Sequence, residues 1–370
     1  MKVVYNSFVG RYSDSPRVLF EALRARGDAI DHVWLAHPDR LEDFPTGVAT
    51  VVHGSAEGRA ALESADVVVS NDHLALDWDK HPGTTYLQTW HGTPLKRIHN
   101  DVFWAPEGRL AYLDQDVARW DHLLSPNAAS TPRFRGAFGF SGPVHETGYP
   151  RNDVLSSPER KRLRAEVRAE LGIADGVTAV LYTPTWRDDL VFSADSPDFS
   201  FPLDLGEFAR DLGEDHLLLL RLHGMVSDRL KVAEDAPIRD VSRYPDIRYL
   251  YLAADVLVTD YSSTMFDFAI TGKPIVHFTY DLPYFRDELR GFYFDLAEAA
   301  PGPLLTSSEE VLGAIAELGP DWQPTQRYTR FQDTFCALED GHATDRVLEV
   351  VFPTAPPAHP TTRGDEHAHS

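Results

Sequence analysis

Cysteine is nearly absent from this sequence of 370 residues, which contains only Cys336. A single cysteine cannot form an internal disulfide framework or a cysteine-based zinc site. Basic residues are also scarce, because 35 Lys and Arg stand against 57 Asp and Glu, giving a formal net charge of −22. This balance argues against a nucleic-acid-binding protein, since such proteins need a basic face to displace counterions.

Long apolar runs are missing as well. No stretch approaches the length needed to cross a bilayer, and the first residues, MKVVYN, turn polar too soon for a signal peptide. The hydrophobic content of 43% and the charged content of 25% are typical of a soluble globular protein. We therefore expect a cytoplasmic protein, with peripheral contact at the inner face of the cell membrane left open.

Apolar strand patterns alternate with helical patterns along the chain, which predicts an α/β protein with doubly wound parallel sheets. The length favours two domains. We expect an N-terminal Rossmann-like domain at 1–154, a C-terminal Rossmann-like domain at 155–335, a C-terminal helix at 336–352 and a disordered tail at 353–370. The charged helix expected at 157–172 is most simply a solvated face.

The stretch 253–278, AADVLVTDYSSTMFDFAITGKPIVHF, predicts a strand, a hydroxyl-rich loop, a helix and a second strand. Ser263 or Thr264 is expected to cap the helix, and Thr264 with Asp267 matches a capping box. Free N–H groups at a helix start favour anions, so the loop with Ser262 and Ser263 is a suitable seat for a phosphate. The simpler interpretation is that the serines only cap the helix.

An octet in the first half resembles one in the second. Residues 65–72, ADVVVSND, and 254–261, ADVLVTDY, each place an apolar strand after Ala-Asp and break it with a hydroxyl residue followed by Asn or Asp. Such a repeat is expected if both halves are similar β/α domains.

Four polar or aromatic residues follow directly after predicted strands: His91, Trp186, His223 and Ser262. In doubly wound sheets ligands bind beyond the carboxyl ends of the strands, so these residues are expected on the binding rims. A phosphorylated substrate would also need local cations. The candidates all lie in the first half, and they are Arg11, Arg17, Lys96, Arg97, Arg133, Arg135 and Arg151.

Several long motifs resemble the CDP-glycerol glycerophosphotransferase family, which comprises the teichoic-acid primases and polymerases and related capsule polymerases. The motifs are QTWHGTPLKRI (88–98), YTPTWRDD (182–189), LRLHG (220–224), YPDIRYLYLAADVLVTDYSSTMFDFA (244–269) and FTYDLPYFRDELRGFYFDL (278–296). They occur in the family's order, and the resemblance extends over nearly the whole of residues 2–352.

The resemblance implies a two-domain GT-B architecture, with the nucleotide held mainly by the C-terminal domain. The implied reaction transfers a polyol phosphate from CDP-glycerol or CDP-ribitol to a hydroxyl of a polymer or glycan acceptor, which can be lipid-linked, and releases CMP. No metal ion and no cofactor are expected. The polyol, the acceptor and the number of units added stay open.

The same resemblance suggests roles for individual residues. His91 is expected to be the general base, because a neutral imidazole can take a proton near pH 7. His223 is expected against the donor diphosphate, although Gly224 stands where the family pattern has proline. The residues expected to bind substrate are Arg11, Trp90, Gly92, Thr93, Lys96, Arg97, Pro184, Thr185, Trp186, Arg187, Arg221, Thr259, Asp260, Ser262 and Ser263.

Two other functions fit the same strand-end residues. A GT-B glycosyltransferase or epimerase would use the serine loop for the diphosphate of a UDP-sugar. A non-catalytic scaffold would bind nucleotide or polymer without turnover, although the presence of both His91 and His223 argues against it.

Overall fold

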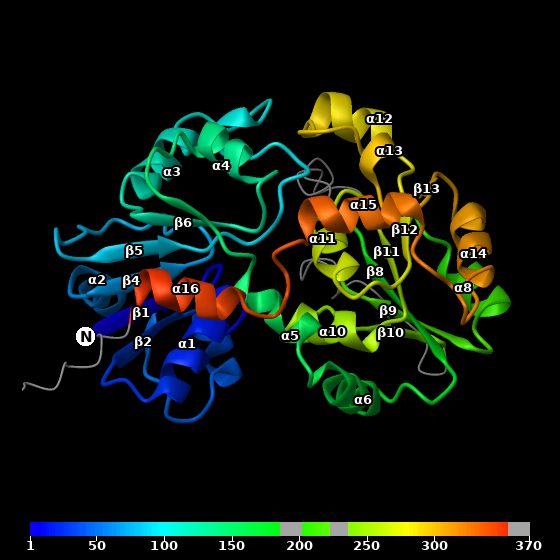
Figure 1. Ribbon diagram of the computed structural model, residues 1–370, viewed down its shortest axis with the longest axis horizontal. Coiled ribbons are helices and arrows are strands. Elements are labelled where there is room, and N and C mark those ends of the chain that lie inside the picture. Colours follow the sequence, from blue (N-terminus) through cyan, green and yellow to red (C-terminus); the bar gives the residue numbers. More distant parts are fainter. Residues whose placement is uncertain (186–201, 223–235, 354–370) are drawn as a thin grey trace, which may run out of the picture.

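The computed structural model describes residues 1–185, 202–222 and 236–353, which form two parallel β-sheets, one in each half of the chain (Figure 1). The first sheet has the order β3-β2-β1-β4-β5-β6-β7. Its strands are β1 (Lys2–Asn6), β2 (Asp31–Ala36), β3 (Thr50–Val52), β4 (Val67–Ser70), β5 (Thr85–Gln88), β6 (His122–Ser125) and β7 (Val144–Glu146).

Helices cover both faces of the first sheet because successive strand residues point to opposite faces. Val4 and Val68 pack with α2, α3 and α4, whereas their neighbours Val3 and Val69 pack with α1. The helices of this half are α1 (Asp14–Arg26), α2 (Ala56–Glu63), α3 (Arg109–Val117) and α4 (Thr131–Phe138), with the short 3-10 segments η1 (Pro38–Asp43), η2 (His99–Asp101) and η3 (Pro150–Asn152).

The second sheet has the order β10-β9-β8-β11-β12-β13, again with parallel neighbours. Leu181 and Leu257 face α5, α6, α10, α11 and α15, while Val180 and Val258 face α8 and α14. The strands are β8 (Thr178–Thr183), β9 (His216–Leu220), β10 (Ile238–Asp240), β11 (Val256–Thr259), β12 (Ile275–Phe278) and β13 (Leu304–Leu305).

The described helices of the second half vary widely in length. They are α5 (Asp153–Ser156), α6 (Arg160–Glu170), α8 (Leu205–Asp211), α10 (Ile247–Ala253), α11 (Thr264–Ala269), α12 (Leu282–Tyr284), the π-helical turn η4 (Phe285–Leu289), α13 (Leu296–Ala299), α14 (Ser308–Ala316), α15 (Gln326–Phe335) and α16 (Ala343–Val351).

The chain returns to the first sheet at its end. Helix α15 packs on the second sheet through Phe331 and Phe335, whereas α16 lies across the first sheet, where Val347 and Phe352 join the core beside α1 (Figure 1). The C-terminal helix expected at 336–352 therefore forms at Ala343–Val351 and belongs to the first core. The predicted division at 154/155 falls within α5, and the domain bounds stay a prediction.

The α/β fold class with two doubly wound parallel sheets is confirmed. Helix α1 begins at Asp14, with Ser13 as its N-cap. Across residues 1–185, 202–222 and 236–353, no helix is both long and apolar enough to pass through a membrane. The tail expected to be disordered lies, from residue 354 on, outside the described residues.

Candidate active site

His91 lies just beyond the carboxyl end of β5 and is half-buried. Its ring stacks on Trp90 with centroids 4.4 Å apart, and the ring centroid of Phe8 lies 5.4 Å from that of His91. The imidazole thus contacts two aromatic side chains at the sheet edge where parallel sheets bind ligands.

One hydrogen bond determines which nitrogen of His91 carries the proton. Nδ1 of His91 lies 2.5 Å from the carbonyl oxygen of Asn71, at the end of the neighbouring strand β4. A carbonyl only accepts, so Nδ1 must donate, and in the neutral ring Nε2 keeps its lone pair. This tautomer is the one a general base requires.

The backbone around His91 is held in an unusual conformation. Phe8 and Trp90 have positive φ values of 51° and 53°. The amide of Trp90 donates to Oε1 of Gln88 at 2.9 Å, and the amide of Phe8 donates to Oδ1 of Asn71 at 2.7 Å. Left-handed backbone in large residues costs energy and is retained mainly at functional sites.

The hydroxyl-rich loop forms beyond β11 in the second sheet. Thr259 donates to the carbonyl of Thr183 at 2.8 Å, and Oδ1 of Asp260 accepts from the amide of Thr185 at 2.9 Å. Thr259 and Asp260 therefore join the ends of β11 and β8, as expected for residues that shape the loop.

The two serines that follow differ in their contacts. Oγ of Ser262 accepts from the amide of Thr264 at 3.3 Å, which is a local capping contact. Ser263 occupies the N-cap position of α11, and its side chain makes no capping hydrogen bond. The side chain of Ser263 is thus not used to start the helix.

Gly92 and Ser263 mark the place where the binding rims of the two sheets, the loops beyond the carboxyl ends of their strands, lie against each other. A Cβ atom added to Gly92 would lie 2.9 Å from Oγ and 3.0 Å from Cβ of Ser263. Only a residue without a side chain fits at this distance. The loop that carries His91 therefore touches the hydroxyl-rich loop of the opposite sheet.

The expected capping box between Thr264 and Asp267 does not form. Asp267, 6% exposed, accepts from Nη2 of Arg151 at 2.8 Å and from Nδ2 of Asn152 at 2.9 Å. Arg151 also pairs with Asp14 at 3.0 Å. Asp267 is turned inward because a buried guanidinium needs carboxylate partners, and the result is an ionic link between the two halves of the chain.

Two further basic residues, one from each half of the chain, follow strands at the carboxyl edges of the sheets. Arg11 is exposed, and Arg221 donates from Nη1 to the carbonyls of Val241 and Tyr244. Burial lowers the pKa of Arg221, and the charge of Arg11 acts in the same direction. Arg11 and Arg221 come from opposite halves of the chain, and their positive charges repel each other. An anion bound between them would therefore be stabilised by both.

The segment 93–97 joins the halves rather than forming an open loop. Lys96 bridges to Phe292, the amide of Arg97 donates to Gly291 O at 3.0 Å, and the guanidinium of Arg97 lies over Phe103. Thr93 is buried. Lys96, Arg97 and Thr93 thus lie near the expected rim but partly serve the contact between the halves.

The other basic candidates have partners of their own, and a role in binding phosphate stays a prediction for them. Arg17 pairs with Glu21, Arg135 donates to the carbonyls of Phe140 and Gly142, and Arg151 is buried between two aspartates. Arg133 lies against the rings of Tyr293 and Phe294.

Three predicted site residues, Trp186, Arg187 and His223, lie outside the described residues. Pro184 and Thr185 are half-buried at the end of β8, next to Asp260. Sequence reasoning missed Phe8, Asn71 and Gln88 as site residues. The octet ending in Asn71 and Asp72 contained the available signal, since it placed Asn71 at a strand end.

The sequence profile of the family described as CDP-Glycerol:Poly(glycerophosphate) glycerophosphotransferase matches residues 1–353. A teichoic acid poly(glycerol phosphate) polymerase of Bacillus subtilis is 36% identical over 95% of this chain and 48% of its own length. A teichoic acid glycerol-phosphate transferase of Staphylococcus aureus is also 36% identical, over 95% of this chain and 92% of its own length. The chain thus spans about half of the first relative and nearly all of the second.

A solved structure agrees with these matches. A variant of the wall teichoic acid polymerase TagF, soaked with CDPG, is 35% identical and superposes with a TM-score of 0.86 over 94% of this chain and 88% of that one.

Proposed function

Because the chain belongs to the CDP-glycerol:poly(glycerophosphate) glycerophosphotransferase family, we propose that it transfers glycerol phosphate from CDP-glycerol to a hydroxyl group of a teichoic-acid-like acceptor and releases CMP. Both the family and the relatives favour this reaction over transfer from a UDP-sugar. The same site chemistry would accept CDP-ribitol, because the polyol itself does not take part in the bond exchange.

The observation that carries the proposal is the close approach of Gly92 to Ser263. It places a histidine loop of one sheet against a hydroxyl-rich loop of the other. Phosphoryl transfer needs a base at the attacking hydroxyl and hydrogen-bond donors or cations at the phosphates. The two rims supply these two needs from opposite sides.

In the proposed reaction the acceptor hydroxyl attacks the phosphorus that carries glycerol. A new P–O bond to the acceptor forms, and the bond from this phosphorus to the bridging oxygen breaks, so that the oxygen leaves with CMP. Nε2 of His91 takes the hydroxyl proton. The Nδ1 contact with Asn71 holds the ring in the required tautomer throughout.

The second rim would compensate the charge of the donor diphosphate. Ser263 offers a hydroxyl that is not used as a cap, and Arg11 and Arg221 contribute positive charge from the two halves. Trp90, Thr93, Pro184 and Thr185 would shape the walls, and Trp186, Arg187 and His223 keep their predicted roles toward the donor.

Exposed aromatic side chains next to the joined halves favour contact with a membrane surface. Phe103 is 51% and Trp104 77% exposed, and the guanidinium of Arg97 lies over Phe103. Exposed aromatic side chains next to an arginine are a combination that inserts at the level of lipid headgroups. Trp104→Ser should reduce co-sedimentation with anionic phospholipid vesicles, whereas Leu41→Ser, a control at another exposed apolar residue, should not.

The function is tested by offering CDP-glycerol, CDP-ribitol and UDP-sugars in parallel and measuring the released nucleotide. We expect CMP from a CDP-polyol and a product that grows by polyol phosphate, as seen by mass spectrometry. Release of UDP alone would favour a sugar transferase or epimerase. No release from any donor, together with intact nucleotide binding, would favour a scaffold.

A further inference from the structure

Helix α6 (Arg160–Glu170) carries positive charges that the proposed reaction does not use. Arg162 pairs with Glu159 and Glu166 on the solvent side, at 2.7 and 2.6 Å. Arg164 instead pairs with Asp255 at 2.5 Å. Arg160 is exposed and has no ion pair or side-chain hydrogen bond within the described part of the chain.

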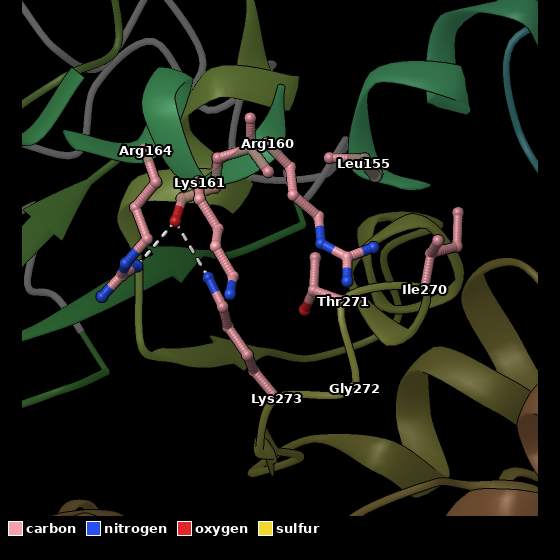
Figure 2. A pocket seen from close by; sticks show the side chains of 9 residues that line it. Leu155, Arg160, Lys161, Arg164, Ile270, Thr271, Gly272 and Lys273 are labelled. Atoms are coloured by element: carbon pink, nitrogen blue, oxygen red, sulfur yellow. Dashed lines mark hydrogen bonds between the residues drawn. The ribbon is translucent and has the colours of Figure 1, made fainter. Parts of the chain in front are cut away.

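Arg160, Lys161 and Arg164 border a cavity of about 290 Å³ between α6 and the turn after α11. Figure 2 shows Arg160 and Lys161 descending from the helix while Lys273 rises from the opposite wall; the end of Lys161 points toward that of Lys273, and the guanidinium of Arg160 points toward Thr271. The lining residues are Leu155, Arg160, Lys161, Arg164, Leu252, Ile270, Thr271, Gly272 and Lys273, and none of them is acidic.

Lys273 is the most constrained of these cations. Its ammonium donates to the carbonyls of Tyr251, Leu252 and Ala254 at 3.1, 2.9 and 2.6 Å. Burial lowers its pKa to about 7, and the nearby charge of Arg164 acts in the same direction. Asp255, the ion-pair partner of Arg164, acts on this pKa in the opposite direction. Uncompensated positive charge at the cavity wall therefore comes from Arg160 and Lys161, which have no ion pair within the described residues, although the protein as a whole is strongly acidic.

The cavity combines this charge with an apolar wall. Leu155, Leu252 and Ile270 lie beside the four cationic side chains. A bare halide would use the charge but not the apolar wall or the forked geometry of Arg160. A phosphoryl group offers several oxygens to Arg and Lys donors at once, and an attached carbon chain can lie on the leucines.

We propose that this cavity is a binding site for the phosphoryl group of a small organic phosphate, separate from the active site. The cavity lies at the amino ends of β11 and β12, because Leu252 precedes β11 and Lys273 precedes β12. Ser263 and His91 lie at the carboxyl ends of their strands. Helix α11 connects the two places, with Ser263 at its start and Ile270 at its end.

The test is calorimetric titration of the full chain with glycerol 3-phosphate and, separately, with inorganic phosphate at constant ionic strength. The double variant Arg160→Ala/Lys161→Ala should weaken binding of glycerol 3-phosphate by about tenfold or more, since two charge-assisted contacts are lost. Arg162→Ala removes a charge from the same helix outside the cavity and should leave the affinity unchanged.

Equal affinity for the two ligands would mean that the phosphoryl group alone accounts for binding. Tighter binding of glycerol 3-phosphate would mean that the wall formed by the apolar side chains also contributes to the affinity. The proposal is wrong if neither ligand binds saturably, or if Arg162→Ala weakens binding as much as the double variant does. His91→Asn should bind both ligands like the wild type, so this result does not depend on whether the proposed transfer reaction is correct.

Discussion

The two sheets share one arrangement of strands, but the histidine next to the corresponding loop has different surroundings in each sheet. Strand β4 lies next to β1, and β11 lies next to β8, so the two repeated octets occupy the same place in the two sheets. The weak sequence repeat therefore marks a real structural equivalence.

The correspondence extends to single hydrogen bonds at the start of the strands. Asp66 accepts from the amide of Lys2 at 2.6 Å, and Asp255 accepts from the amide of Ala179 at 2.9 Å. In each sheet the aspartate before the octet strand holds the first residues of the neighbouring central strand.

The same holds at the carboxyl ends. Asn71 accepts from the amide of Phe8, and Asp260 accepts from the amide of Thr185. The backbone carbonyls of the same two residues, Asn71 and Asp260, each lie next to an imidazole. Nδ1 of His91 lies 2.5 Å from the carbonyl oxygen of Asn71, and Nδ1 of His277 lies 3.5 Å from that of Asp260.

The difference is exposure. His277 lies inside β12 and is fully buried, and its Nε2 has no hydrogen-bond partner within the described residues. His91 lies three residues beyond the end of β5, where the chain has left the sheet. One scaffold thus holds two imidazoles by Nδ1, but His277 is enclosed in the core, whereas His91 lies half-buried at the edge of its sheet.

The largest effect is expected from His91→Asn. It removes the proposed base, so turnover should fall by about a thousandfold, in the range of general-base catalysis. The measurement is CMP release from CDP-glycerol, with circular dichroism to check the fold. His277→Asn, the matched change in the other sheet, should retain most of the turnover of correctly folded protein. Equal losses in the two variants would contradict the distinction.

The second effect concerns pH. Burial lowers the pKa of His277 to about 4 from an ordinary value of 6.5. The unfolded chain therefore takes up a proton before the folded one does as the pH falls, and stability should decline between about pH 6.5 and 4 by up to about 3 kcal/mol. His277→Asn should reduce this decline in urea unfolding at pH 7, 6 and 5. An unchanged decline would show that His277 is not its source.

The sequence revealed the strands, the strand-end histidine and the serine loop, because these depend on local patterns and on motifs. It did not reveal that Asp267 turns inward to Arg151, since that pairing joins residues 116 positions apart and overrides the local capping pattern. Phe8 was missed for a similar reason: its positive φ and its contact with His91 exist only after β1, β4 and β5 align.

A third effect tests the contact between the two rims. Gly92→Ala should lower kcat/KM by about a hundredfold, because its Cβ would displace Ser263 and shift the His91 loop. Adding Ser263→Gly removes the clashing atoms, so the double variant should resemble Ser263→Gly alone.

Gly136→Ala is the control for this series, because nothing lies within 4 Å of the added Cβ in α4. It should leave kcat/KM unchanged. Additive losses for Gly92→Ala and Ser263→Gly would mean that the two rims do not touch in the working enzyme.

The smallest effect compares the two aspartates that hold the central strands. Asp66→Asn should cost at most about 1 kcal/mol of unfolding free energy, because asparagine keeps an oxygen that can accept from the amide of Lys2 and only the charge is lost at an exposed site. Asp255 also pairs with Arg164 and Arg168, so Asp255→Asn should cost about 2 kcal/mol or more. Urea unfolding of both variants measures the difference. Equal costs would mean that the arginines of α6 contribute nothing to holding β8, and that the two sheets are equivalent at this end as well.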